Sequence, residues 1–186
     1  MSAYDEHSLT GGGIRVAFRF ERDRFAHAIE IADGDAWIPL LNSIEGTPDD
    51  DWPASPPLQS LHRESRGAKQ VALLVGMAGK SHWSASVELD PQQGSLLFDI
   101  ACRVLGELQE RLGSSHVLLH PARLIDDEAI VWTLDRASWR LTCRGDCGAA
   151  RLSTTPELIR ISPCGDSAIA RRTVRWGYEL VRLSGD

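Results

Sequence analysis

Apolar and polar residues alternate along much of this chain, which is the pattern of β-strands that bury one face. Residues 14–21 place Ile14, Val16, Phe18 and Phe20 on one face and mostly polar side chains on the other. The nearly continuous apolar run predicts a buried strand at residues 70–77. Further strands are predicted in the following segments: 25–31, 37–41, 82–90, 96–104, 117–119, 130–134, 139–143, 151–153, 158–161 and 174–180.

Short polar or glycine-containing turns separate these strands. Arg22-Asp23 predicts a hairpin turn, and Gly79 is expected to take a positive φ in a tight turn. Turn signals at regular intervals between about a dozen short strands are typical of antiparallel architectures. We therefore expect an all-β fold, a single antiparallel β-barrel or β-sandwich with at most one or two short helices. The strand pattern does not separate barrel from sandwich.

One segment has helical spacing. Leu105, Leu108 and Leu112 fall on one face of a helix over residues 105–112, and Gly113 follows where a helix commonly ends. We expect a helix of about two turns there.

The domain organisation follows from two segments without periodicity. Residues 1–13 are polar and end in three glycines, so we expect a flexible N-terminal tail before a single β-rich domain over 14–186. A long Pro-rich acidic loop is predicted at 45–69, because this segment holds four prolines and the run Asp49–Asp51. Two interpretations stay open for it, a lid that carries Trp52 and a disordered insertion.

Composition narrows the classes of partner and compartment. The chain has 186 residues, 42% of them hydrophobic, and a formal net charge of −6. An acidic balance argues against a dedicated nucleic-acid binder, which needs a basic surface to displace counterions. The longest apolar runs are too short to span a membrane, and the first residues lack a secretory pattern. We therefore expect a cytoplasmic protein without nucleic-acid or membrane partners.

Two motifs that suggest phosphate or metal binding do not have the required spacing. Gly76–Ser81 resembles a phosphate-binding loop, but two residues are missing, and a strand pattern follows where a helix is required. His116 and His120 would converge on one ion only on a helix, whereas Val117–Leu119 and Pro121 favour a strand. We expect no metal site and no cofactor.

The four cysteines do not form a recognisable metal or redox motif. Cys143 and Cys147 are separated by three residues, whereas zinc knuckles and redox pairs usually have two. Cys164 could supply a third thiolate, and two disulfides are arithmetically possible. We interpret all four cysteines, Cys102 included, as reduced.

Tryptophan supplies the candidate binding residues. Four of six lie on predicted apolar strand faces, and His27 lies on the apolar face of a hairpin between Phe25 and Ile29. Core packing explains these positions, and an aromatic-lined cavity is the competing interpretation. The candidate ligand-binding residues are Trp83, Trp132, Trp139, Trp176 and His27.

Three hypotheses for function remain, and no catalytic motif is recognised. The first is non-catalytic binding of a small, partly apolar or aromatic-stacking ligand in a cavity between the sheets. The second is a protein-interaction module or homodimer that pairs through exposed strands such as residues 171–183. The third is a hydrolase or isomerase with a pocket containing His27, His82 or Asp99. The sequence favours a non-enzymatic function over an enzymatic one.

Overall fold

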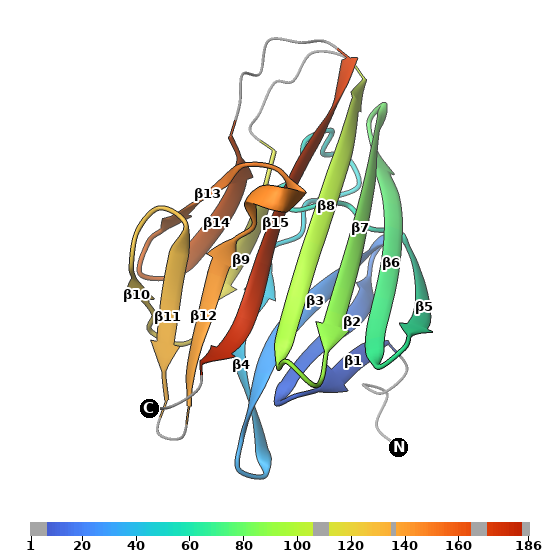
Figure 1. Cartoon of the computed structure of the whole chain (residues 1–186). Helices are drawn as coiled ribbons and strands as arrows, with labels where there is room; N and C mark the ends of the chain where they lie inside the picture. The colour runs from blue at the N-terminus through green and yellow to red at the C-terminus, as the bar shows by residue number, and fades with distance from the viewer. Residues whose placement is uncertain (1–6, 106–111, 135–136, 165–170, 184–186) are drawn as a thin grey trace.

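Two antiparallel β-sheets make up the protein (Figure 1). The computed structural model describes residues 7–105, 112–134, 137–164 and 171–183. The sheets have seven and eight strands, and they do not close into one barrel. The all-β prediction is confirmed, and of its two forms the arrangement corresponds to a sandwich.

The spatial order of the strands differs from their order in the chain in both sheets. The seven-stranded sheet contains, from one edge to the other, β1 (Ser8–Gly11), β2 (Ile14–Glu21), β3 (Arg24–Asp33), β4 (Ala36–Ser43), β9 (Ser114–Leu118), β14 (Leu158–Pro163) and β13 (Ala150–Thr154). The eight-stranded sheet contains β10 (Arg123–Leu124), β11 (Ala129–Thr133), β12 (Ser138–Cys143), β15 (Arg171–Leu183), β8 (Ser95–Leu105), β7 (Ser81–Asp90), β6 (Lys69–Ala78) and β5 (Ser60–Arg66).

The alternating pattern determines which side chains enter the core. In β2, Ile14, Val16 and Phe18 are buried, while Arg19 on the opposite face is exposed. The inward residues of both sheets form one continuous apolar cluster. Burial of this cluster is the main favourable contribution to folding.

The predicted N-terminal tail is wrong for residues 8–11. These residues form β1, which pairs antiparallel with β2 from Ser8 opposite Ala17 to Gly11 opposite Ile14. Gly12 and Gly13 have φ values of 59° and 78°, a conformation that glycine adopts without steric cost. The glycines that suggested flexibility therefore form a hairpin turn. Residues 1–6 lie outside the described part.

The predicted loop at 45–69 is also too long. Residues 60–66 form β5, an edge strand paired with β6 along its whole length. Its polar sequence resembles a loop because an edge strand buries little side-chain surface. The preceding segment is tied to the sandwich, since the Phe25 amide donates to the Leu58 carbonyl at 2.7 Å and Leu58 is buried.

The predicted turns are present, whereas the predicted helix cannot be compared over its full length. Gly79 has a φ of 53°, which confirms the positive φ predicted for it, and Arg22, in the predicted hairpin turn, has a φ of 62°. The predicted helix at 105–112 overlaps the end of β8, and residues 106–111 lie outside the described residues. A short 3₁₀ helix, η1 (Gly145–Cys147), lies between β12 and β13.

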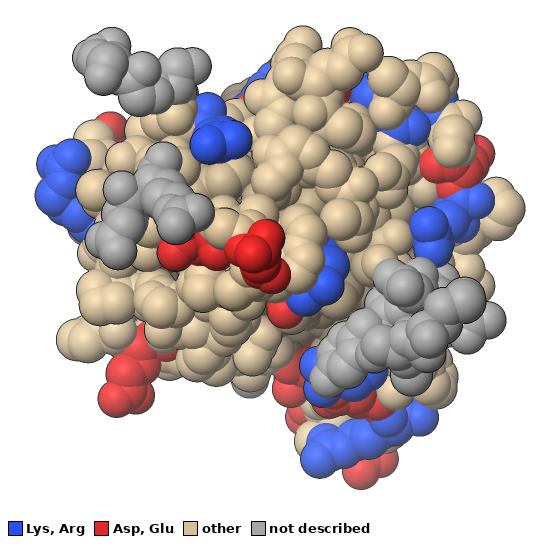
Figure 2. Space-filling model, turned by 90° about the horizontal axis from the view of Figure 1, so that it is seen from below, with Lys and Arg blue, Asp and Glu red and all other residues tan. Residues whose placement is uncertain are grey.

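Two further observations concern membranes and surface charge. Within the described ranges, no helix has the length and apolar character needed to cross a membrane. Figure 2 shows acidic and basic side chains interspersed on the face seen from below, without a broad basic surface there. A cytoplasmic location stays a prediction.

Candidate functional site

The four candidate tryptophans pack inside the sandwich. Trp83, Trp132, Trp139 and Trp176 are each at most 2% exposed. Trp83 meets Trp176 edge to face with ring centroids 6.1 Å apart, and Trp132 lies opposite Trp139 in the β11–β12 register. Such pairs stabilise a core beyond the area that they bury.

Two of these indole groups also have hydrogen-bond partners. The Trp176 Nε1–H donates to Ser114 Oγ at 3.1 Å, and the Trp132 Nε1–H donates to the His120 carbonyl at 3.2 Å. A satisfied indole N–H removes most of the free-energy cost of burying this polar group. Trp83 Nε1 is buried without a partner among the described residues.

His27 also points into the sandwich, where it meets a second histidine. Its Nε2 atom lies 3.3 Å from His116 Nε2, and Tyr178 Oη lies 3.5 Å from the same His116 atom. The rings of Phe98 and Tyr178 stack beside them with centroids 4.7 Å apart. Sequence reasoning found His27 but missed this partnership, because His116 belongs to a strand far away in the chain.

Burial controls the protonation of this cluster. It lowers the pKa of His27 to about 4 and, together with the neighbouring His27, lowers the pKa of His116 well below its ordinary value. Burial likewise raises the pKa of Tyr178 far above its ordinary value. At neutral pH all three groups are uncharged and screened from solvent. Among the described residues, no group of three or more His, Cys, Asp or Glu could hold a metal ion.

A buried carboxyl group lies just beyond β4. Ser43 Oγ donates to Glu45 Oε1 at 2.6 Å, whereas Glu45 Oε2 is buried without a partner in the described structure. Burial raises the pKa of Glu45 to about 7, although Ser43 and the Arg24 charge oppose the shift. Arg24 is itself buried, and its guanidinium contacts Asp23 and the Thr47 carbonyl.

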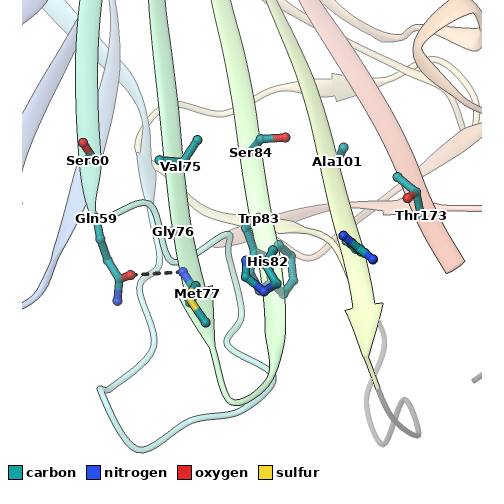
Figure 3. A pocket seen from close by; sticks show the side chains of 11 residues that line it. Gln59, Ser60, Val75, Gly76, Met77, His82, Trp83, Ser84, Ala101 and Thr173 are labelled. Carbon is teal, nitrogen blue, oxygen red and sulfur yellow. Dashed lines mark hydrogen bonds between the residues drawn. The ribbon is translucent and has the colours of Figure 1, made fainter. Parts of the chain in front are cut away.

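A hollow lies on the outer face of the eight-stranded sheet. This outer-sheet groove has a volume of about 530 Å³ and is open to solvent. Val75 and Met77 project into it from β6 and are 55% and 46% exposed (Figure 3). Its lining residues are Gln59, Ser60, Val75, Gly76, Met77, His82, Trp83, Ser84, Ala101, Arg103 and Thr173.

Strand register arranges the groove in two transverse rows. One row runs from β6 to β15 through Met77, His82, Arg103 and Thr173. The second row begins at Ser60 on β5 and continues through the following residues: Val75, Ser84, Ala101 and Arg175.

At the edge of the groove, Gln59 is fixed in place by a hydrogen bond. Its Oε1 atom accepts from the Met77 amide at 3.0 Å (Figure 3). The groove therefore has a defined wall at the side where the loop meets β6.

Of the five candidate ligand-binding residues, Trp83 alone borders this groove, and His82, named in the third hypothesis, borders it as well. Trp139 borders a smaller hollow of about 200 Å³, and His27 borders one of about 160 Å³. Sequence reasoning missed Val75 and Met77 because the continuous apolar run at 70–77 indicates a buried strand. The available signal was the strand period, which turns alternate residues of that run outward.

Comparisons with known proteins extend only to the fold. No protein-family model matches the sequence, and no curated protein matches it. A solved structure of heparinase III with methylated lysines is similar, with a TM-score of 0.52 at 10% sequence identity. The match covers 96% of this chain and 36% of that one, so the chain spans about a third of that protein's length. At this identity the likeness shows a shared β-sandwich fold.

Proposed function

We propose that this protein binds a small, partly apolar ligand in the outer-sheet groove without transforming it. The observation that carries the proposal is that Val75 and Met77, two large apolar side chains, are about half exposed side by side on neighbouring rows. Exposed apolar surface inside a hollow favours a ligand that removes it from water. A volume of about 530 Å³ is within the usual range for small-molecule sites.

The proposed location differs from the cavity between the sheets that the sequence suggested. The tryptophans expected to line that cavity pack against one another and against the inner faces of both sheets. A close-packed interior leaves little room for a ligand. The outer-sheet groove already has the required exposed surface, so no rearrangement of the core is needed.

The lining chemistry favours binding over catalysis. His82 and Arg103 are the ionisable side chains of the groove, and its described lining includes no Asp, Glu or Cys. A histidine such as His82 can act as a general acid or base, but catalysis usually also needs a nucleophile or a group that orients the base. No hydrogen bond joins His82 to Ser60 or Ser84 in the described structure. Asp99, on the same sheet face, is held by Arg175 at 2.7 Å.

The structurally similar heparinase III suggests a second ligand for comparison in binding experiments. The name heparinase refers to heparin, which is a strongly anionic and polar sugar chain. The groove residues Val75 and Met77 favour a ligand with an apolar body instead. Heparin fragments therefore serve as a probe that should bind more weakly than an apolar one.

Calorimetric titration with octanamide, an uncharged apolar chain with a polar head, tests the proposal. We expect saturable binding that the double substitution Val75→Ser, Met77→Ser weakens by roughly 10-fold or more, because about half of the apolar contact is lost. Leu158→Ser, an equally exposed position on the other sheet, is the matched control and should leave binding unchanged. Binding that is absent, or indifferent to the double substitution, would overturn the proposal.

A further inference from the structure

The outer face of the eight-stranded sheet has an uneven distribution of charge. The two rows of the outer-sheet groove contain His82, Arg103 and Arg175 but no carboxylate. Acidic residues begin one row further along the strands, at Asp99. Glu88 and Glu179 follow in the next row, where both lie opposite Leu97. The two rows that form the groove therefore have basic but no acidic side chains, although the whole chain has a net charge of −6.

Arg103 has the free charge in this region. Its side chain is exposed, and no carboxylate pairs with it among the residues that the structure describes. Arg175, which lies on the same face of the sheet, is engaged by Asp99 at 2.7 Å. An unpaired guanidinium at the edge of a groove can bind a carboxylate through two parallel N–H···O bonds.

The apolar and cationic parts of the groove are separated across the strands. Met77 and Val75 lie on β6, while Arg103 lies on β8, with β7 between them. Adjacent strands are about 4.8 Å apart, so the apolar and cationic sides are separated by roughly 10 Å. His82, between Met77 and Arg103, offers a further hydrogen-bonding group. A ligand that fits this division has an anionic head and an apolar chain.

We propose that the ligand of the outer-sheet groove is an amphiphilic carboxylate, with its head on Arg103 and its chain across β7 to Val75 and Met77. This inference rests on the proposed function, since it names the chemical class that the same groove would take. Charge complementarity selects this occupant over an uncharged one, and the size of the groove selects a small molecule over a protein.

Octanoate and octanamide provide the matched test, because they differ in charge but hardly in shape. Calorimetric titrations at low ionic strength are carried out on the wild-type chain, on Arg103→Gln and on Arg140→Gln. Arg140 lies on the same outer face but on β12, away from the groove. We expect octanoate to bind the wild-type chain about 10-fold more tightly than octanamide, which is a typical effect of one charge-assisted contact. Arg103→Gln should remove this preference without weakening octanamide, and Arg140→Gln should retain it.

The outcomes separate this inference from the proposed function. Equal binding of octanoate and octanamide to the wild-type chain overturns the anionic ligand but leaves the groove as a binding site. A preference for octanoate that survives Arg103→Gln overturns the assignment of the head group to Arg103. Absence of binding by both probes overturns both proposals. Unchanged thermal unfolding of Arg103→Gln verifies that the variant is folded, as expected for an exposed side chain.

Discussion

The Nε2 atoms of His27 and His116 lie 3.3 Å apart inside the sandwich, with their ring planes at 74°. Their strands, β3 and β9, are separated by β4, where Ser43 pairs with His116 and accepts a hydrogen bond from the His27 amide. His116 Nδ1 is buried and has no partner in the described structure, so this pair remains stable only while both rings are neutral.

We predict that acid destabilises the fold through this histidine pair. In the unfolded chain a histidine has a pKa of about 6.5, whereas burial lowers the pKa of folded His27 to about 4. The unfolded state therefore binds more protons as pH falls below 6.5, and the free energy of unfolding decreases by about 1.4 kcal/mol per pH unit for each such histidine. Urea unfolding between pH 6.5 and 5 measures this slope. His27→Phe should reduce it by one histidine's contribution.

A packing variant separates the proton effect from loss of contacts. Phe98→Leu removes part of the ring surface against His27 without changing a titrating group. It should lower stability by a similar amount at every pH in this range. A slope that is the same in the wild type and in His27→Phe would contradict the account.

Glu45 is predicted to have the opposite pH dependence. Its folded pKa is raised to about 7 from an ordinary value of 4.5, so the folded state retains the proton longer than the unfolded state. Stability associated with this group is present below pH 4.5 and is lost as pH rises through 7. Glu45→Gln mimics the protonated acid, so it should raise the free energy of unfolding at pH 8 by on the order of 1–3 kcal/mol and change it little at pH 5. An equal effect at both pH values, measured by urea unfolding, would show that Glu45 is ionised in the folded protein.

The core role of Trp176 leads to a further prediction. Trp176→Phe removes the hydrogen bond to Ser114 Oγ and part of the edge contact with Trp83. We expect a loss of roughly 2–4 kcal/mol in the free energy of unfolding. Trp37→Phe is the control, because Trp37 is only half-buried beneath Arg15, and it should cost less than about 1 kcal/mol. Similar losses in both variants would argue against a tightly packed interior.

Gly76 is predicted to be required for the close approach of the loop to β6. A Cβ atom at this position would lie 1.7 Å from the Pro57 carbonyl oxygen. Gly76→Ala must therefore displace the loop backbone, at a cost of about 1–3 kcal/mol or more. Ser84→Ala, on an exposed position of the same groove, should stay within about 0.5 kcal/mol of the wild type. Thermal unfolding compares the two, and a Gly76→Ala variant of wild-type stability would contradict the contact.

The sequence predicts the strands well because a sandwich buries every second residue. This period also places His27 correctly on an inward face. The pattern is silent about which strands become neighbours, so the contact of His27 with His116, 89 positions away, was not predictable. Local signals also have two meanings: glycines 11–13 suit both a tail and a turn, and the polar β5 suits both a loop and an edge strand.

The groove was missed for a related reason. Val75 and Met77 belong to an apolar run, and hydrophobicity alone does not separate a strand that is buried on both faces from one with an apolar outer face. The sequence alone does not indicate that Arg103 is a candidate binding residue. Its role in the groove depends on its register with His82 and on its separation from Asp99, which only the structure shows.

Mapping of amide chemical shifts during titration with octanoate tests the central claim most directly. We expect saturable changes concentrated at residues 75–77, 82–84 and 101–103, which are adjacent only on the outer face of the eight-stranded sheet. Changes confined to β9 and β14 on the other sheet, or changes that do not saturate, would contradict a binding site in the outer-sheet groove.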